Sequence, residues 1–360
     1  MSRIYINGRF LTQQTTGVQR FAREIVRAVD TLLVSRGRDR TRSLVLLTPP
    51  GTTLMAGLRA IECRSVGMLQ GQAWEQLELP RHTRGGFSLN LCNTAPLAGS
   101  STIVAVHDAG VFAVPEAYSR PFRTWYRLLH PELGRRAVRM LTVSEFSRAE
   151  LSRYLGIDAD RLTVIPNGGD HILRDPADPS ILSRIGLTGR YVLAVSSHSA
   201  HKNFAGIQAA VKLMRRQGVT LVFAGGTNSR VFSAGEAPDG ESRVTGRVTD
   251  AELRALYENA ECFVYPSFYE GFGLPPLEAM TCGCPVVVSR VASLPEVCGE
   301  AAVYCDPQDP ADIGRALDEV LESAGLRSEL RRRGEERAAQ FTWSRSGTAL
   351  LSLLDGLPAR

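Results

Sequence analysis

Residues 262–289, CFVYPSFYEGFGLPPLEAMTCGCPVVVS, predict two buried strands joined through a loop and a short helix. The stretch opens with an apolar run, which is the pattern of a buried strand. Pro275 and Pro276 then suit the first turn of a helix, where a missing N–H costs nothing. We expect Glu278 in that first turn. A Cys-Gly-Cys-Pro break ends the helix, and residues 285–289 predict the next strand.

Two carboxylates flank this Gly-Pro loop. Glu270 precedes it and Glu278 follows it. In open α/β sheets ligands bind at the carboxyl ends of strands, and a helix N-terminus attracts anions. A structural role fits equally well at this point, because glutamate in a first turn complements the helix dipole in many proteins. The spacing therefore predicts either a ligand site or an ordinary helix start.

Strand and helix patterns alternate along both halves of the chain. Residues 168–188 are rich in Gly, Pro and Asp and lack periodicity, so we expect a connection there. Two alternating halves predict an α/β fold of two doubly wound, Rossmann-like domains with a cleft between them. Strands are predicted at residues 3–6, 43–47, 87–91, 102–106, 141–143, 162–165, 191–197, 219–224, 243–246 and 303–305. Helices are predicted at residues 18–34, 74–79, 121–139, 204–216, 250–259, 310–323, 326–340 and 343–354.

Composition indicates a globular protein with a sizeable core, since 44% of the 360 residues are hydrophobic and 22% charged. No apolar run reaches the roughly 18 residues of a membrane span, and no secretory signal is evident, so we expect a cytoplasmic location. The seven cysteines show no disulfide-framework spacing. For Cys282 and Cys284 packing is favoured over metal binding, because no second Cys/His pair accompanies them.

The net charge of +5 is unevenly distributed. Residues 1–170 hold 22 Arg, no Lys and 14 acidic residues, a net charge of +8, whereas residues 171–360 carry −3. A basic N-terminal half suggests an anionic partner, either a phospholipid surface, a lipid-linked phosphate or nucleic acid. We expect no nucleic-acid partner, because no nucleic-acid motif is present. A solvated arginine-rich surface is the alternative.

Lysine is rare in this chain. Of 42 basic residues only Lys202 and Lys212 are lysines. Lys202 lies between a predicted strand end and a helix start, flanked by His198 and His201, and its compact charge suits a diphosphate. A surface lysine near a turn is the alternative. His107 also follows a strand directly, where it could donate a hydrogen bond, act as a base or simply be a buried structural histidine.

With seven residues between Glu270 and Glu278, the motif resembles the signature of retaining glycosyltransferases of family four, which have the GT-B fold. Other segments fall in that family's order along nearly the whole chain. These are residues 16–20 (TGVQR), 107–108 (HD), 143–147 (VSEFS), 164–168 (VIPNG) and 201–203 (HKN). His201 is a departure, because the family has arginine there. The resemblance implies an N-terminal acceptor domain (1–170), a C-terminal nucleotide-sugar domain (171–340) and a C-terminal helix (341–360) that returns to the first domain.

The resemblance also implies chemistry: a nucleotide-diphospho-sugar donor, no cofactor and no required metal. Glu270 would hold hydroxyls of the donor sugar, Glu278 the ribose hydroxyls, and Lys202 would neutralise the departing diphosphate. Charge placed on that leaving group lowers the barrier of a transfer through an oxocarbenium-like transition state. His107 would contact the donor sugar from across the cleft. The remaining predicted donor-site residues are Gly17, Asn203, Gly225, Gly273 and Leu274.

The sugar and the acceptor are narrower expectations. Residues 74–80, WEQLELP, and His107-Asp108 resemble bacterial members that build surface polysaccharides. We therefore favour mannose from GDP-mannose, passed to a glycan or to a polyprenyl-diphosphate-linked oligosaccharide. Arginines between residues 120 and 139 would give peripheral contact with the inner face of the membrane. Two alternatives stay open: a nucleotide-sugar epimerase or hydrolase on the same fold, and a non-catalytic nucleotide-sugar-binding protein.

Overall fold

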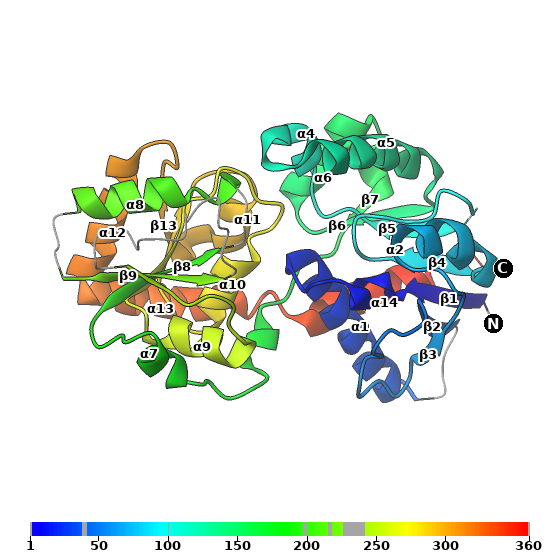
Figure 1. Ribbon diagram of the computed structural model, residues 1–360, viewed down its shortest axis with the longest axis horizontal. Helices are drawn as coiled ribbons and strands as arrows, with labels where there is room; N and C mark the ends of the chain where they lie inside the picture. The colour runs from blue at the N-terminus through cyan, green and yellow to red at the C-terminus, as the bar shows by residue number, and fades with distance from the viewer. Residues whose placement is uncertain are drawn as a thin grey trace. The chain divides into compact units, whose positions relative to one another are not determined.

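The computed structural model describes residues 2–37, 42–99, 101–196, 200–214, 218–225 and 242–358. His198 lies outside these ranges, as do residues 228–241, for which the polar sequence predicts a loop. The chain forms two compact units. The first comprises residues 1–115, 119–167 and 343–360, and the second comprises 116–118 and 168–342. Each unit is built on a parallel sheet covered by helices (Figure 1).

The first unit contains a parallel sheet of seven strands within the described residues, in the order β3-β2-β1-β4-β5-β6-β7. Its inner strands are apolar and buried because helices cover both faces, as parallel sheets require. The strands are β1 (Ser2–Asn7), β2 (Arg42–Thr48), β3 (Glu62–Ser65), β4 (Phe87–Asn90), β5 (Thr102–Ala105), β6 (Arg139–Thr142) and β7 (Leu162–Val164). The helices are η1 (Gly8–Thr12), α1 (Gly17–Ser35), α2 (Gly71–Ala73), the π-helix η2 (Trp74–Glu78), α3 (Leu79–His82), α4 (Gly110–Ala113), α5 (Arg120–Arg136), α6 (Glu145–Leu155), η4 (Ala159–Arg161) and α14 (Trp343–Asp355). The short η3 (Pro115–Ala117) has its first residue in this unit and its other two in the second.

The C-terminal helix α14 packs on α1, which confirms the predicted return of the chain to the first domain (Figure 1). The ring of Trp343 meets Phe21 edge-on, with centroids 6.0 Å apart. Gly347 allows the close approach, because a Cβ there would come within 3.0 Å of the Ala28 side chain. Ser346 Oγ donates a hydrogen bond of 2.6 Å to the carbonyl of Pro166.

The second unit contains a parallel sheet of six strands among the residues described, in the order β10-β9-β8-β11-β12-β13. The strand of the Glu270 motif, β11, lies between β8 and β12, where both edges are paired. The strands are β8 (Tyr191–Ser196), β9 (Thr220–Gly225), β10 (Ser242–Val244), β11 (Cys262–Tyr265), β12 (Val286–Ser289) and β13 (Ala302–Cys305). The helices are η5 (Asp170–Leu173), α7 (Ser180–Arg184), η6 (Ala200–Lys202), α8 (Phe204–Leu213), α9 (Asp250–Asn259), α10 (Leu274–Thr281), α11 (Leu294–Cys298), η7 (Gly299–Ala301), α12 (Pro310–Glu322) and α13 (Ala324–Ala338).

Two predicted elements need correction, and one strand was not predicted. The helix expected at 121–139 ends at Arg136, because Val138 N already donates to Thr102 O and begins the sheet. Strand β3 was not predicted, because it is an edge strand whose four residues are mostly exposed and carry no apolar run. The connection predicted at 168–188 contains η5 and α7, which are too short to produce a helical period.

Candidate functional site

The turn from β11 into α10 depends on Gly273. This residue precedes the helix with a φ of 94°, a conformation that favours glycine. A Cβ there would also lie 2.6 Å from the Leu294 side chain. Leu274 is the first helical residue, and Pro275 and Pro276 follow in the first turn as predicted.

Glu278 lies in the second turn of α10, so its predicted place in the first turn is wrong. The helix begins at Leu274, one residue before the prolines, and Glu278 is its fifth residue. The helix-dipole explanation for this glutamate therefore weakens, since the dipole effect falls off within the first turn. Its carboxylate has specific partners instead. His171 Nε2 lies 2.9 Å from Oε1, and the Tyr257 hydroxyl lies 3.3 Å from Oε2.

Glu270 and Lys202 form a close ion pair. Lys202 Nζ lies 2.6 Å from Glu270 Oε1, and the two side chains are only 12% and 11% exposed. Lys202 also donates a hydrogen bond to the Tyr265 hydroxyl. Burial alone would raise the pKa of the Glu270 carboxyl, but the charge of Lys202 and hydrogen bonds from Lys202 and Tyr265 hold that pKa below its usual value. The carboxylate is therefore ionised near neutral pH.

His201, which departs from the family pattern, lies beside this pair. Its Nε2 is 3.8 Å from Glu270 Oε1. Burial lowers the pKa of His201 to about 4, despite the opposing effect of Glu270. The imidazole is therefore neutral near pH 7, whereas the arginine of the family pattern would carry a charge. Lys202 supplies the fixed positive charge of this loop.

Asn203 fastens the Lys202 loop to its neighbours. Its backbone is left-handed, with a φ of 57°, and its Oδ1 accepts a hydrogen bond from Gly206 N at the start of α8. Its Nδ2 donates to the carbonyls of Pro266 and Pro307, at 3.1 and 2.7 Å. The side chain therefore joins three loops at the carboxyl end of the sheet.

Gly225 lies at the same edge as the last residue of β9. It has a φ of 126°, and its N–H donates to the carbonyl of Gly246. It pairs with Ser196 at the end of β8. The described part of β9 stops here.

His107 and Gly17 belong to the first unit. His107 Nε2 lies 2.9 Å from the carbonyl of Leu91, and its ring meets Phe21 at 4.8 Å. Burial lowers the pKa of His107 to about 4, so the ring is neutral near pH 7. Gly17 begins α1 directly after Thr16, which forms a capping box with Gln19. The capping box of Thr16 and Gln19 starts the helix, so Gly17 has no side-chain role in it.

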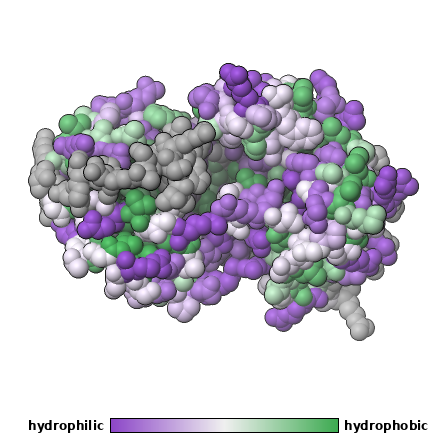
Figure 2. Space-filling view, in the orientation of Figure 1, coloured by the Kyte–Doolittle hydropathy of each residue, from purple (hydrophilic) through white to green (hydrophobic). Residues whose placement is uncertain are grey.

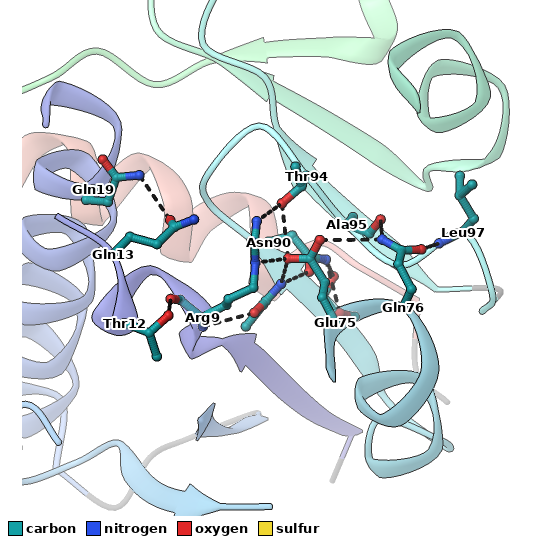
Figure 3. A network of polar contacts seen from close by, with 12 residues as sticks. Arg9, Thr12, Gln13, Gln19, Glu75, Gln76, Asn90, Thr94, Ala95 and Leu97 are labelled. Carbon is teal, nitrogen blue, oxygen red and sulfur yellow. Dashed lines mark hydrogen bonds and ion pairs between the residues drawn. The ribbon is translucent and has the colours of Figure 1, made fainter. Parts of the chain in front are cut away.

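The WEQLELP segment supplies a buried carboxylate, Glu75, at the carboxyl ends of β1 and β4 (Figure 3). Glu75 Oε2 accepts hydrogen bonds from Asn7, Arg9 and Thr94 at 2.8 to 3.0 Å. Asn7 also donates to Asn90, so the network ties the two strand ends together. Pairing is necessary here, because Arg9 and Glu75 are 8% and 1% exposed and an unpaired buried charge is strongly destabilising.

Sequence reasoning missed three side chains of the second unit. Tyr265, His171 and Tyr257 each contact a predicted site residue and are nearly fully buried. Tyr265 resembled any other residue of an apolar strand, and His171 fell in the connection. Among the described residues no group of three or more His, Cys, Asp or Glu side chains could hold a metal ion.

Two family profiles match the chain. Residues 183–338 match the family described as Glycosyl transferases group 1, and residues 15–173 match Glycosyltransferase Family 4. The chain belongs to glycosyltransferase family 4. It is therefore a retaining hexosyltransferase with the GT-B fold, as the sequence predicts.

Curated relatives of this glycosyltransferase include the O-antigen chain mannosyltransferase B of Escherichia coli. It is 36% identical over 263 residues, which cover 69% of each chain. The serotype-specific mannosyltransferase WbdA of the same species is 30% identical over 261 residues, which cover 68% of this chain but only 32% of WbdA. Among solved structures, sucrose-phosphate synthase from Thermosynechococcus elongatus aligns with a TM-score of 0.74 at 18% identity, covering 99% of this chain and 98% of that one. This last likeness supports the fold.

Proposed function

We propose that this glycosyltransferase moves mannose from GDP-mannose to a glycan or polyprenyl-diphosphate-linked acceptor in polysaccharide biosynthesis. The observation that carries the proposal is the buried Lys202–Glu270 pair at the carboxyl end of β11. The names of the relatives support the sugar, because both are mannosyltransferases, one of the O-antigen chain. The second unit would hold the donor and the first unit the acceptor.

The proposed donor site uses each end of the Glu270–Glu278 loop differently. Glu270 accepts hydrogen bonds from the sugar hydroxyls, and Glu278 from the ribose hydroxyls. Gly273 and Leu274 offer backbone N–H groups to the donor at the start of α10. Asn203 and Gly225 keep the neighbouring loops in place. Gly17 and His107 of the first unit contact the phosphates and the donor sugar.

The chemistry depends on positioned charge. As the bond between the anomeric carbon and the phosphate oxygen breaks, the sugar develops oxocarbenium character and the diphosphate gains negative charge. Lys202 and backbone N–H groups stabilise that leaving group in a site that excludes water. The neutral His107 donates from Nε2 to the carbonyl of Leu91, so its Nδ1 can accept a hydrogen bond from a sugar hydroxyl without adding charge. The acceptor hydroxyl attacks on the face that the diphosphate leaves and passes its proton to the departing phosphate oxygen, so the anomeric configuration is retained.

Helix α5 supports peripheral contact with the inner face of the membrane. Phe122, Trp125 and Leu128, three large apolar side chains spaced three residues apart on it, are 42%, 36% and 67% exposed. Arginines accompany them at positions 120, 123, 127, 135 and 136. Figure 2 shows hydrophobic and hydrophilic residues side by side over the part of the first unit where Figure 1 places α4 and α5. Within the described ranges, no helix has the length and hydropathy to cross a bilayer.

A ligand panel tests the donor. GDP, UDP, ADP and dTDP are added separately at 1 mM, and thermal unfolding is recorded. A ligand at about 100 times its dissociation constant stabilises the folded state by about 2.7 kcal/mol. We expect the largest shift with GDP, followed by transfer from GDP-mannose that stops in Glu270→Gln. A larger shift with another base would overturn the GDP assignment, and full-rate cleavage of the donor without acceptor would favour a hydrolase.

A further inference from the structure

Tyr265 places a hydroxyl between the two charged groups of the site. It is the last residue of β11 and is 2% exposed. Its hydroxyl accepts a hydrogen bond from Lys202 Nζ, which also lies 4.6 Å from the centre of its ring. The same Nζ is 2.6 Å from Glu270 Oε1. An ammonium, a carboxylate and a phenol thus meet in one buried cluster.

The direction of these hydrogen bonds follows from the chemistry of the three groups. An ammonium can only donate and an ionised carboxylate can only accept. The phenol can therefore accept from Lys202 and donate its own proton to Glu270. Burial and the negative charge of Glu270 raise the pKa of Tyr265 well above its usual value, so the phenol keeps that proton at neutral pH.

We propose that Tyr265 is a positioning residue of the transfer reaction, which allows Lys202 to leave Glu270 for the donor diphosphate. This inference rests on the proposed function. In the free protein Lys202 is the main partner of the buried carboxylate. When a diphosphate attracts the ammonium, the Tyr265 hydroxyl still donates to Glu270. The carboxylate then stays ionised and aligned toward the sugar instead of taking up a proton.

Packing needs only the ring of Tyr265. The ring stacks on Phe263 with centroids 5.6 Å apart, and a phenylalanine would keep that contact. The hydroxyl, in contrast, contributes hydrogen bonds to two charged neighbours, Lys202 and Glu270, in a site with little access to water. Removing the oxygen alone therefore separates the positioning role from the structural one.

The test compares Tyr265→Phe with a matched control, Tyr191→Phe. Tyr191 lies on the neighbouring strand β8, is also 2% exposed, and donates to a backbone carbonyl, that of Leu256, at 2.6 Å. Transfer from GDP-mannose is measured against pH. We expect Tyr265→Phe to lower kcat by about tenfold or more, the usual effect of losing a hydrogen bond to a charged group, with KM changing less. The acidic limb of the pH profile should also move to higher pH.

A second measurement needs no turnover. GDP binding is followed by calorimetry at pH 6 in buffers of different ionisation enthalpy, which gives the number of protons taken up. We expect Tyr265→Phe to take up more protons on binding than the wild type or Tyr191→Phe, because Glu270 loses both donors at once. Normal GDP binding with equal proton uptake and a kcat matching Tyr191→Phe would overturn the role of Tyr265 alone. Failure of the wild type to bind any nucleotide would overturn the proposed function as well.

Discussion

We expect the substitution His171→Phe to weaken nucleotide binding. It would disorder Glu278, the carboxylate proposed to accept hydrogen bonds from the ribose hydroxyls. His171 comes from η5, and its side chain is completely buried. Its Nε2 lies 2.9 Å from Glu278 Oε1, within reach to donate a hydrogen bond to that oxygen. Phenylalanine fills a similar volume but donates nothing, so one carboxylate oxygen loses its donor.

The size of the effect follows from the contacts. A hydrogen bond to a charged group contributes about 1.5–3 kcal/mol, which corresponds to about 10–150-fold in a dissociation constant. Tyr257 still donates to the other oxygen of Glu278, at the longer distance of 3.3 Å. We therefore expect the lower end of this range, with about tenfold weaker binding of GDP.

Calorimetry with GDP and with its 2′,3′-dideoxy analogue isolates the ribose contact. The wild type should bind GDP much more tightly than the dideoxy analogue. This preference should shrink in His171→Phe, because the misplaced Glu278 carboxylate no longer accepts hydrogen bonds from the ribose hydroxyls. His171→Gln is the matched control, since its amide can donate from nearly the position of Nε2 and should restore most of the preference. If His171→Phe keeps the full preference for GDP while remaining folded, Glu278 is not positioned by His171 and the reasoning fails.

Three further perturbations test other parts of the molecule. Lys202→Met should reduce kcat for GDP-mannose by about 100-fold or more, which is the scale seen when one stabilising donor is removed from a developing anion. The control variant Lys212→Met, which replaces the exposed lysine of α8, should keep a kcat near that of the wild type. Equal kcat values for the two variants would exclude a role of Lys202 on the leaving group. The free energy of unfolding should fall as pH drops from about 6.5 to 4. Burial lowers the pKa of His107, His130 and His201 to about 4, so the unfolded chain binds more protons than the folded one in this pH range. Each histidine therefore contributes up to about 3 kcal/mol of stability above about pH 6.5, and this contribution is lost by about pH 4. His130→Met should flatten that fall in pH-dependent chemical denaturation, and an unchanged slope would contradict the burial argument. Replacing Phe122, Trp125 and Leu128 together by Ser should reduce co-sedimentation with vesicles that contain anionic phospholipid, and wild-type binding should weaken with salt; equal sedimentation of both proteins would rule out α5 as the contact.

Strong periodic patterns predicted most of the fold because burial dictates them. Strands such as β11 and β12 are buried on both faces, so their residues must be apolar in an unbroken run. β3 escapes that rule as an exposed edge strand. Helix α10 begins at Leu274, one residue before the prolines that suggested its start. The positive φ of Gly273 turns the chain into the helix at that point, and the sequence pattern did not reveal it. That single residue decided whether Glu278 fell in the first or the second turn.

The sequence likewise predicted only part of the candidate site. Lys202 could be found from its rarity and from its place after a strand, both of which are local properties of the sequence. Tyr265 and His171 could not, because their importance lies in contacts with residues 63 and 107 positions away. A tyrosine in a strand or a histidine in a connection carries no local sign of such a partner. Long-range pairing becomes visible only when the sheet brings the loops together.

The contact between α1 and α14 has a consequence for the order of folding. Arg36 and Asp355, which form an ion pair across this contact, are 319 positions apart in the chain. At synthesis rates of roughly 5–20 residues per second, the apolar face of α1 waits roughly 15–60 seconds for its partner helix. During that interval Phe21 lacks Trp343, its edge-on partner. The nascent first unit therefore exposes the apolar face of α1 until translation has passed residue 355.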